Sequence, residues 1–204
     1  MEGFPYMEYI APGLVMMSVI TNSYGNVVGS FFNAKIQGHI EELLVSPLSE
    51  ISIVIGYLAG GIIRGLAVAT VVTFIALFFT QINIKHPFMT FFVIIMTAAV
   101  FSLAGLINAI FAKKFDDIAV IPSFVLAPLT YLGGVFYTVS LLPDFWQTLS
   151  RFNPILYMIN SMRYSVIGIS DVSIQNALMM IVFFFILLFA TAVILLKKGI
   201  GIRQ

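Results

Sequence analysis

Five long apolar stretches, separated by short polar segments, constrain this sequence more than any motif does. They run over residues 9–34, 51–80, 88–112, 118–137 and 176–196. A helix needs about 20 apolar residues to cross the hydrocarbon core of a bilayer, where its backbone polar groups must be satisfied internally. Each stretch reaches that length, so the sequence predicts an all-α, polytopic membrane protein. We expect one domain over residues 1–204, with five transmembrane helices.

Composition supports this class and argues against others. Hydrophobic residues make up 60% of the chain and charged residues 9%, whereas roughly a quarter of a soluble domain is charged. The net charge of +1 does not favour nucleic acid as a partner. Because the chain has no Cys, disulfides, thiolate metal sites and cysteine nucleophiles are excluded.

The basic residues predict the orientation of the chain, since Lys and Arg near the ends of spans stay cytoplasmic. Given five spans, one side carries Lys35, Lys113, Lys114, Lys197, Lys198 and Arg203, and the other carries Lys85, Arg151 and Arg163. We therefore expect the segment around Lys35 and the C-terminus to be cytoplasmic, and the N-terminus to be outside.

A polar segment over residues 35–49 separates the first two stretches. Within it, Ile36, Ile40, Leu43 and Leu44 recur at i, i+4, i+7 and i+8, which predicts a striped helix over about residues 36–47. Pro47 is expected to end this helix, and Ser49 to cap the next one. A helix resting on lipid headgroups is expected to carry more basic residues. Docking to a protein is therefore the favoured interpretation.

Two blocks of sequence resemble the ABC-2 type exporter permeases. Residues 31–49, Phe-Phe-Asn-Ala-Lys-Ile-Gln-Gly-His-Ile-Glu-Glu-Leu-Leu-Val-Ser-Pro-Leu-Ser, resemble the coupling-helix region of that family. Residues 133–143, Gly-Gly-Val-Phe-Tyr-Thr-Val-Ser-Leu-Leu-Pro, followed by Asn153-Pro154 and Arg163, are similar to its late signature segment. The blocks are in the family's order and spacing, and the resemblance covers essentially the whole chain.

The resemblance implies a transport subunit in a bacterial inner membrane, not an enzyme. In that family the permease dimerises, forms the translocation path and exports drugs, glycans or lipids, so we expect an amphipathic or lipid-linked substrate. The family also has a cytosolic amphipathic helix and a first span ahead of the stretch that begins near Tyr9. We expect this chain to lack both, which leaves five spans where the complete fold has six.

The resemblance also implies that the coupling helix binds a separate ABC ATPase. The expected contact residues are Gly38, His39, Ile40, Glu41, Glu42, Leu43, Leu44, Val45, Ser46 and Pro47, with Ile40, Leu43 and Leu44 as buried anchors. Glu41 and Glu42 are expected to meet basic groups of the ATPase. The sequence has no Gly-x-x-x-x-Gly-Lys-Ser/Thr loop to hold ATP phosphates. We therefore expect no cofactor in this chain, with ATP and Mg bound by the partner ATPase. A channel or scaffold that uses the same helix for another cytosolic partner is the alternative.

Arg64 interrupts the second stretch. An arginine near the bilayer centre costs about 2.5–3.5 kcal/mol on insertion scales, so it is expected to face protein or water. It shares a face with Gly56 and Gly60, and Gly61 with Gly65 forms another small-xxx-small pair, which predicts close helix packing. Two interpretations of Arg64 stay open. It lines the translocation path and attracts an anionic group, or it is a structural arginine bonded to carbonyls or to the Asn- and Ser-rich half of the first stretch.

Residues 140–171 are apolar but too interrupted to span a membrane. Two short helices split at Asn153-Pro154 are expected to form an outer re-entrant hairpin, and irregular backbone at that depth must be covered by protein or line a cavity. The candidate outer-gate residues are Pro143, Asn153, Pro154 and Arg163, and a plain interfacial hairpin is the alternative. Upstream, Pro122, Pro128 and Gly133-Gly134 are expected to bend or break the fourth stretch.

Other polar residues do not assemble a catalytic or metal site in the sequence. Asp116 and Asp117 have no third carboxylate or His close by, so we expect a solvated turn beside Lys113-Lys114. His39 and His86 are expected on opposite sides of the membrane and cannot share a metal. A membrane enzyme is therefore the weakest of the function classes.

Overall fold

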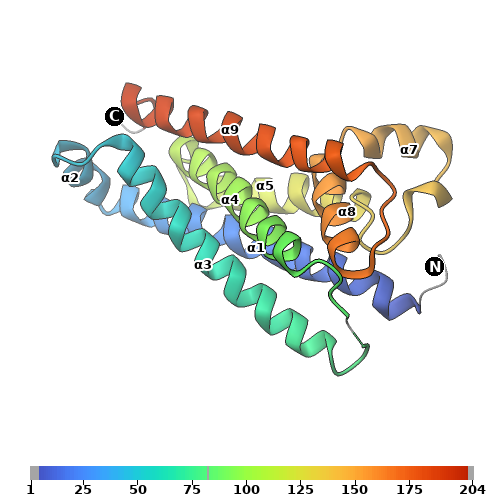
Figure 1. Ribbon diagram of the computed structural model, residues 1–204. Coiled ribbons are helices and arrows are strands. Elements are labelled where there is room, and N and C mark those ends of the chain that lie inside the picture. The colour runs from blue at the N-terminus through green and yellow to red at the C-terminus, as the bar shows by residue number, and fades with distance from the viewer. Residues whose placement is uncertain (1–4, 82, 202–204) are drawn as a thin grey trace.

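The structure, a computed structural model, describes residues 5–81 and 83–201, and every regular element in this part is helical (Figure 1). The side chains of Glu41, Leu44, Val45 and Ser140 lie outside the description. In chain order the elements are α1 (Tyr6–Ile36), α2 (His39–Val45), α3 (Glu50–Ala76), α4 (Pro87–Phe111), α5 (Phe115–Ile121), the π-helical turn η1 (Pro122–Leu126), α6 (Ala127–Leu132), the 3-10 turn η2 (Val139–Leu141), α7 (Asp144–Arg151), α8 (Pro154–Ile167) and α9 (Ile174–Lys198).

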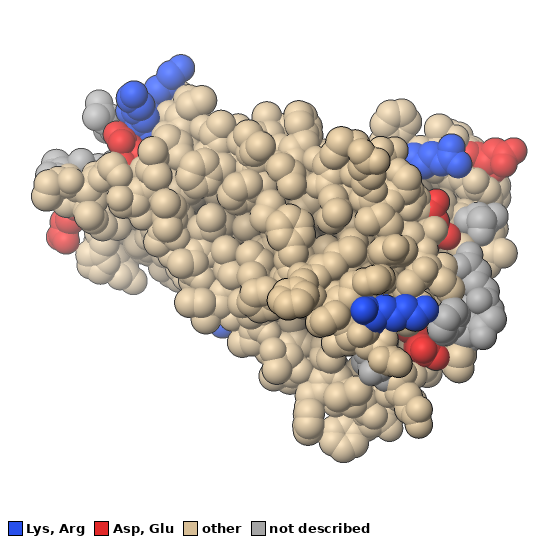
Figure 2. Space-filling model, viewed as in Figure 1, with Lys and Arg blue, Asp and Glu red and all other residues tan. Residues whose placement is uncertain are grey.

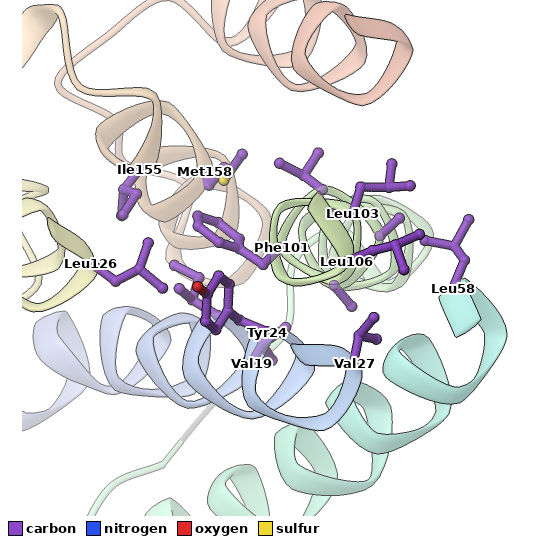
Figure 3. Close-up of a cluster of buried hydrophobic side chains, with 14 of the residues drawn as sticks. Val19, Tyr24, Val27, Leu58, Phe101, Leu103, Leu106, Leu126, Ile155 and Met158 are labelled. Carbon is purple, nitrogen blue, oxygen red and sulfur yellow. The ribbon is translucent and has the colours of Figure 1, made fainter. Parts of the chain in front are cut away.

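Helix α4 is the centre of the bundle and packs against α1, α3, α8 and α9. Of its most apolar 18 residues, 67% are buried, against 17% in α3 and 11% in α9. Figure 3 shows Leu103 and Leu106 of α4 within a cluster that also includes Val27 of α1, Leu58 of α3 and Met158 of α8. Lipid is as apolar as Leu, so these helices are held together by close packing more than by removal of apolar surface from water.

Four helices in the described part are long and apolar enough to cross a membrane: α3, α4, the run from α5 to α6 (Phe115–Leu132) and α9. The chain is therefore an all-helical, multi-pass membrane protein, as predicted. Helix α1 is continuous over 31 residues but is not among the four, because the polar residues of its second half lower its mean hydropathy. The fifth span over residues 9–34 stays a prediction.

The two ends of the bundle carry different connections (Figure 1). Helix α2 and the C-terminal end of α9 lie at one end, and α7 and the start of α1 lie at the other. Most charged side chains visible in Figure 2 gather toward these ends, with a largely uncharged surface between them. Lys197 and Lys198 thus share the end of α2, as the orientation argument requires, whereas Arg203 lies outside the described residues.

The fourth predicted span is distorted at Pro122. Pro122 has no backbone N–H and its ring crowds the preceding turn, and here the helix widens into the π turn η1 before it continues as α6. The helix then ends at Leu132 and not at residue 137, because a turn follows in which Gly134 adopts a left-handed backbone with φ 78°.

Side-chain caps set several helix starts. Ser49 Oγ accepts a hydrogen bond from the Ser52 amide at 3.2 Å, which confirms the cap predicted for α3. Asn153 Oδ1 accepts from the Ile155 amide at 3.0 Å at the start of α8. The region after Ser140 does form two short helices, α7 and α8, and they separate at Asn153-Pro154.

Two glycines let α3 approach its neighbours closely. A Cβ on Gly61 would lie 2.8 Å from Val27 Cγ2 and 2.9 Å from Ser102 Cβ, and one on Gly65 would lie 2.9 Å from Ala98 Cβ. Carbon atoms in contact are about 3.5–4.0 Å apart. The predicted close packing at this pair is therefore present, between α3 and both α1 and α4.

Candidate functional site

The connection between α1 and α3 holds the short helix α2 against the bundle. Gly38 has a left-handed backbone with φ 77°, which turns the chain immediately after α1 and lets α2 begin at His39. At the other end, Ser46 Oγ donates to the Leu43 carbonyl oxygen at 2.7 Å. Helix α2 therefore covers residues 39–45 and is shorter than the predicted 36–47.

The predicted apolar stripe does not face one way. Ile40 is only 2% exposed and belongs to the chain's own core, and Leu43 packs against that core. Ile36 ends α1 and is 55% exposed. Ile40 thus fastens α2 to the bundle and does not face a partner. The predicted contacts of Glu41, Leu44 and Val45 rest on side chains outside the description.

The outward surface of this connection is mixed in polarity. His39, Glu42, Pro47 and Leu48 are exposed, and Ser46 is half-buried. Between α2 and α3 lies a cavity of about 310 Å³, lined by Leu43, Leu48, Ser52, Ile53, Gly56 and Tyr57. Among the side chains that the structure describes, this surface offers Glu42 and His39 beside an apolar hollow.

Lys35 ties this connection to the central helix. Its Nζ donates to the carbonyl oxygens of Ile110 at 2.6 Å and Ala112 at 3.0 Å, at the C-terminal end of α4. Carbonyls at the end of a helix have no partner within that helix, and a cation there also interacts favourably with the helix dipole. Burial, and then the charge of Lys113, lower the pKa of Lys35. The clamp couples the end of α1 to α4.

The carboxylates after α4 serve the backbone. Asp117 Oδ2 accepts hydrogen bonds from the amides of Lys113 at 2.8 Å and Lys114 at 3.0 Å. Both Asp116 and Asp117 lie in the first turn of α5, where negative charge is favourable. Within the described residues, no three His, Asp or Glu side chains are grouped to hold a metal ion.

A polar groove runs along the C-terminal half of α1, which the predicted orientation makes the inner half, on the side that faces Arg64. Its volume is about 340 Å³, and it is lined by Thr21, Asn22, Gly25, Asn26, Gly29, Ser30, Asn33 and Arg64. The structure thus brings Arg64 of α3 to the Asn- and Ser-rich half of α1, as one interpretation expected. Arg64 is nevertheless exposed. No hydrogen bond or ion pair of its guanidinium is present within the part of the chain that the structure describes.

Gly56 and Gly60 do not support close packing within this chain. Both are exposed, and a Cβ added to either would meet nothing within 4 Å. The face that they share with Arg64 is open, whereas the next face of the same helix, with Gly61 and Gly65, is closely packed. Arg64 therefore points along an uncovered side of α3.

At the other end of the bundle, Arg163 of α8, a candidate gate residue of the predicted hairpin, is fully buried. Its Nη2 donates to the Gly134 carbonyl oxygen at 2.6 Å, its Nη1 lies 3.9 Å from Asp171 Oδ2, and its guanidinium carbon is 4.0 Å from the centre of the Tyr9 ring. Four segments of the chain meet at this one side chain. Arg163 therefore links α1, α8, the turn after α6 and the loop after α8.

The other candidate gate residues have separate positions. Asn153 is buried and, besides capping α8, donates from Nδ2 to the Leu129 carbonyl oxygen at 2.5 Å. Pro154 is the first residue of α8, and Pro143 is exposed and precedes α7. Asn153 and Arg163 are thus buried and hydrogen-bonded within the chain, whereas Pro143 is exposed.

Tyr9 and Asp171 were missed in the sequence as partners of Arg163. Tyr9 stands at the start of an apolar stretch, where an aromatic residue is typical of a membrane interface. Asp171 is the only acidic residue between Asp144 and the C-terminus, and this was the one available signal that it pairs with a nearby basic residue.

Comparison with known proteins agrees with this architecture. The sequence matches the ABC-2 type transporter family over residues 2–167. It is 51% identical over 204 residues to the inner membrane transport permease YadH of Escherichia coli K12, which covers all of this chain and 80% of that protein. It is 26% identical over 163 residues to Nodulation protein J of Sinorhizobium fredii NGR234, which covers 79% of this chain and 62% of that protein. Both segments that carried the resemblance, residues 31–49 and 133–163, lie within the matched range.

Proposed function

Because the chain belongs to the ABC-2 type transporter family, we propose that it is the permease subunit of an ATP-driven exporter that draws its energy from a separate ATPase. The transport role and the inner-membrane location agree with the relative named an inner membrane transport permease. The observation that carries the finer proposal is the attachment of α2. This helix projects from one end of the bundle, yet Ile40 and Lys35 fasten its surroundings to the core.

That attachment gives a mechanical route from a cytosolic partner to the spans. A rigid contact on His39 and Glu42 moves α2, and α2 is joined to α1 through the turn at Gly38. The Lys35 bonds carry the movement to the end of α4, which packs against α1, α3, α8 and α9. Movement of the exposed connection is thereby passed to the centre of the bundle.

The polar groove supplies the corresponding path. Asn and Ser side chains along α1 are costly in contact with lipid, so this face is expected to meet water or protein. We propose that two copies of the chain face each other across this side of α1 and α3 and enclose the path. The open glycines Gly56 and Gly60 leave room for a close approach there.

The coupling part is tested by purifying the tagged full chain from its own membranes and measuring ATP hydrolysis in the purified assembly. We expect an ATPase with a phosphate-binding loop to accompany the chain, and Glu42→Arg to reduce both its recovery and the hydrolysis rate. Asp144→Arg makes the same charge change on α7 at the opposite end and is expected to have no effect. Equal recovery with both variants would contradict the coupling role of α2.

The alternative, a channel or scaffold, makes a different prediction in proteoliposomes. A channel conducts or leaks without nucleotide, whereas the exporter moves its substrate only with ATP and the partner. Leakage that is independent of ATP, and unchanged by Glu42→Arg, would favour the channel. A scaffold would retain its partner and show neither transport nor leakage.

A further inference from the structure

We propose that the joint face of α1 and α3 binds an anionic amphiphile, with its anionic group at Arg64, its polar portion along the inner half of α1 and its apolar tail along the outer half. This assignment names a substrate class for the path described above and so rests on the proposed function. The proposal rests on a polar groove and an apolar cavity that lie on one face, and on the charge of Arg64 near the boundary between them.

The first step is the continuity of the face. The polar groove is followed toward the outer end by an apolar cavity of about 230 Å³, lined by Met7, Ile10, Ala11, Leu14, Val72, Ile75, Ala76, Phe79 and Thr80. On α1, Leu14 of the apolar cavity and Asn22 of the polar groove are linked through Ser18 by steps of four residues, so they share one side of the helix. On α3, Arg64, Val68 and Val72 follow the same rule.

The second step is the change of chemistry along that face. From Thr21 to Asn33 the polar half extends over about 18 Å, at 1.5 Å per residue. The outer half, from Met7 to Leu14, extends over about 10 Å and is almost entirely apolar. Arg64 lies near the junction, because its neighbour Gly65 packs on Ser23 of α1. A ligand that fits both halves has a polar part and an apolar tail.

The third step is the charge. No acidic side chain lines either hollow within the described residues. The acidic residues on these two helices, Glu8 and Glu50, are each 14 residues along the helix from Asn22 and Arg64, or about 21 Å. Arg64 is therefore a positive charge at membrane depth without a counter-ion on its own helix or on α1. A guanidinium binds carboxylate and phosphate with paired hydrogen bonds, so an anion is the complementary group.

The test measures equilibrium binding of radiolabelled dodecyl phosphate to the full chain in phosphatidylcholine nanodiscs, without ATPase or nucleotide. We expect saturable binding that Arg64→Gln weakens about tenfold or more, since a hydrogen bond to a charged group contributes about 1.5–3 kcal/mol. Arg151→Gln, on the exposed surface of α7, is expected to bind as the unmodified chain does. Size-exclusion profiles and melting temperatures verify that each variant is folded.

Two competitors separate the parts of the ligand. Dodecyl maltoside has the tail without the charge, and inorganic phosphate has the charge without the tail, so both are expected to compete poorly. Competition by inorganic phosphate as strong as that by dodecyl phosphate would overturn the amphiphile and leave a simple anion site. Unchanged binding in Arg64→Gln would overturn the role of Arg64.

A second copy is the other candidate occupant of this face. If it fills the face, dodecyl phosphate does not bind and Arg64→Gln alters the monomer–dimer equilibrium, a result that overturns the proposal. The binding measurement is independent of ATPase coupling, because the Glu42→Arg variant is expected to lose the ATPase and still to bind dodecyl phosphate normally. Loss of amphiphile binding with ATP coupling intact would thus refute the substrate class and leave the transport role standing.

Discussion

Replacing Gly61 by Ala tests how closely α3 packs on the bundle. The new Cβ would lie 2.8 Å from Val27 Cγ2 and 2.9 Å from Ser102 Cβ, and closer still to Ser102 Oγ. Since carbon atoms in contact are about 3.5 Å apart, α3 and α4 must separate by about 0.6 Å along the line to Ser102 Cβ, and Ser102 Oγ must in addition rotate away. The helices around α3 cannot absorb that shift independently, because α4 also packs on α1, α8 and α9.

Gly60 provides a matched control on the adjacent position of the same helix. A Cβ on Gly60 would meet nothing within 4 Å, while both substitutions gain the same helix preference of Ala over Gly, about 1 kcal/mol. The difference between the two variants therefore isolates the overlap. Overpacking costs about 1–3 kcal/mol, so Gly61→Ala is expected to be less stable than Gly60→Ala by that amount.

Thermal unfolding of the monomeric protein in detergent measures this difference, because no second copy then contacts Gly60. In a chain of this size each kcal/mol shifts the melting temperature by about 2–4 °C. Ser102→Gly removes both Ser102 atoms that the new Cβ meets, so the double variant is expected to recover part of the loss. Equal melting temperatures for Gly61→Ala and Gly60→Ala, or strict additivity in the cycle with Ser102→Gly, would refute the packing argument.

Three further changes test the hairpin and the orientation. Asn153→Ala removes the cap of α8 and the bond to Leu129, and is expected to lower the unfolding free energy by about 1–3 kcal/mol in a thermal melt. Arg163→Met leaves Asp171 without its buried partner, and is expected to cost about 3 kcal/mol or more in the same assay. The chain has no Cys, so single cysteines report sidedness. An impermeant maleimide added to spheroplasts is expected to label Lys85→Cys and to spare His39→Cys.

Each of these predictions has a contrasting outcome. Arg151→Met is the control for Arg163, because Arg151 is exposed, and a similar loss in both would show that burial of Arg163 is not responsible. Asn153→Asp keeps the capping oxygen but loses the donor to Leu129, so stability equal to that of Asn153→Ala would deny the cap any contribution. Labelling of His39→Cys before permeabilisation would invert the orientation.

Local chemistry in the sequence predicts much of this fold. Ser49 caps α3, Pro122 sits at a distortion of the helix, and the hairpin divides at Asn153-Pro154, because each depends on a residue and its immediate neighbours. The family resemblance is likewise confirmed by the match over residues 2–167. These features require no knowledge of which helices touch.

The features that the sequence could not provide depend on contacts between distant segments. The sequence pattern of α2 shows that Ile40 is apolar, but it does not show that Ile40 is buried in the core of its own chain. Gly56 and Gly61 both belong to small-residue pairs in the sequence, yet only at Gly61 would a Cβ meet close neighbours. This difference depends on where α1 and α4 lie. The burial of Arg163 needs Tyr9, 154 residues away along the chain, to be beside it.

The π turn η1 takes up one residue more than a regular helical turn does. In a regular α-helix an additional residue would rotate everything that follows by about 100° about the helix axis, and the wider turn absorbs that residue. Leu126 and Thr130 are the buried residues of η1 and α6, and the wider turn keeps both directed inward. Deleting Ser123, an exposed residue of η1, is therefore expected to convert the π turn into an α turn and to leave both residues buried. Inserting a second residue there exceeds what the turn absorbs and is expected to rotate both away from the core, so this position tolerates a deletion and not an insertion.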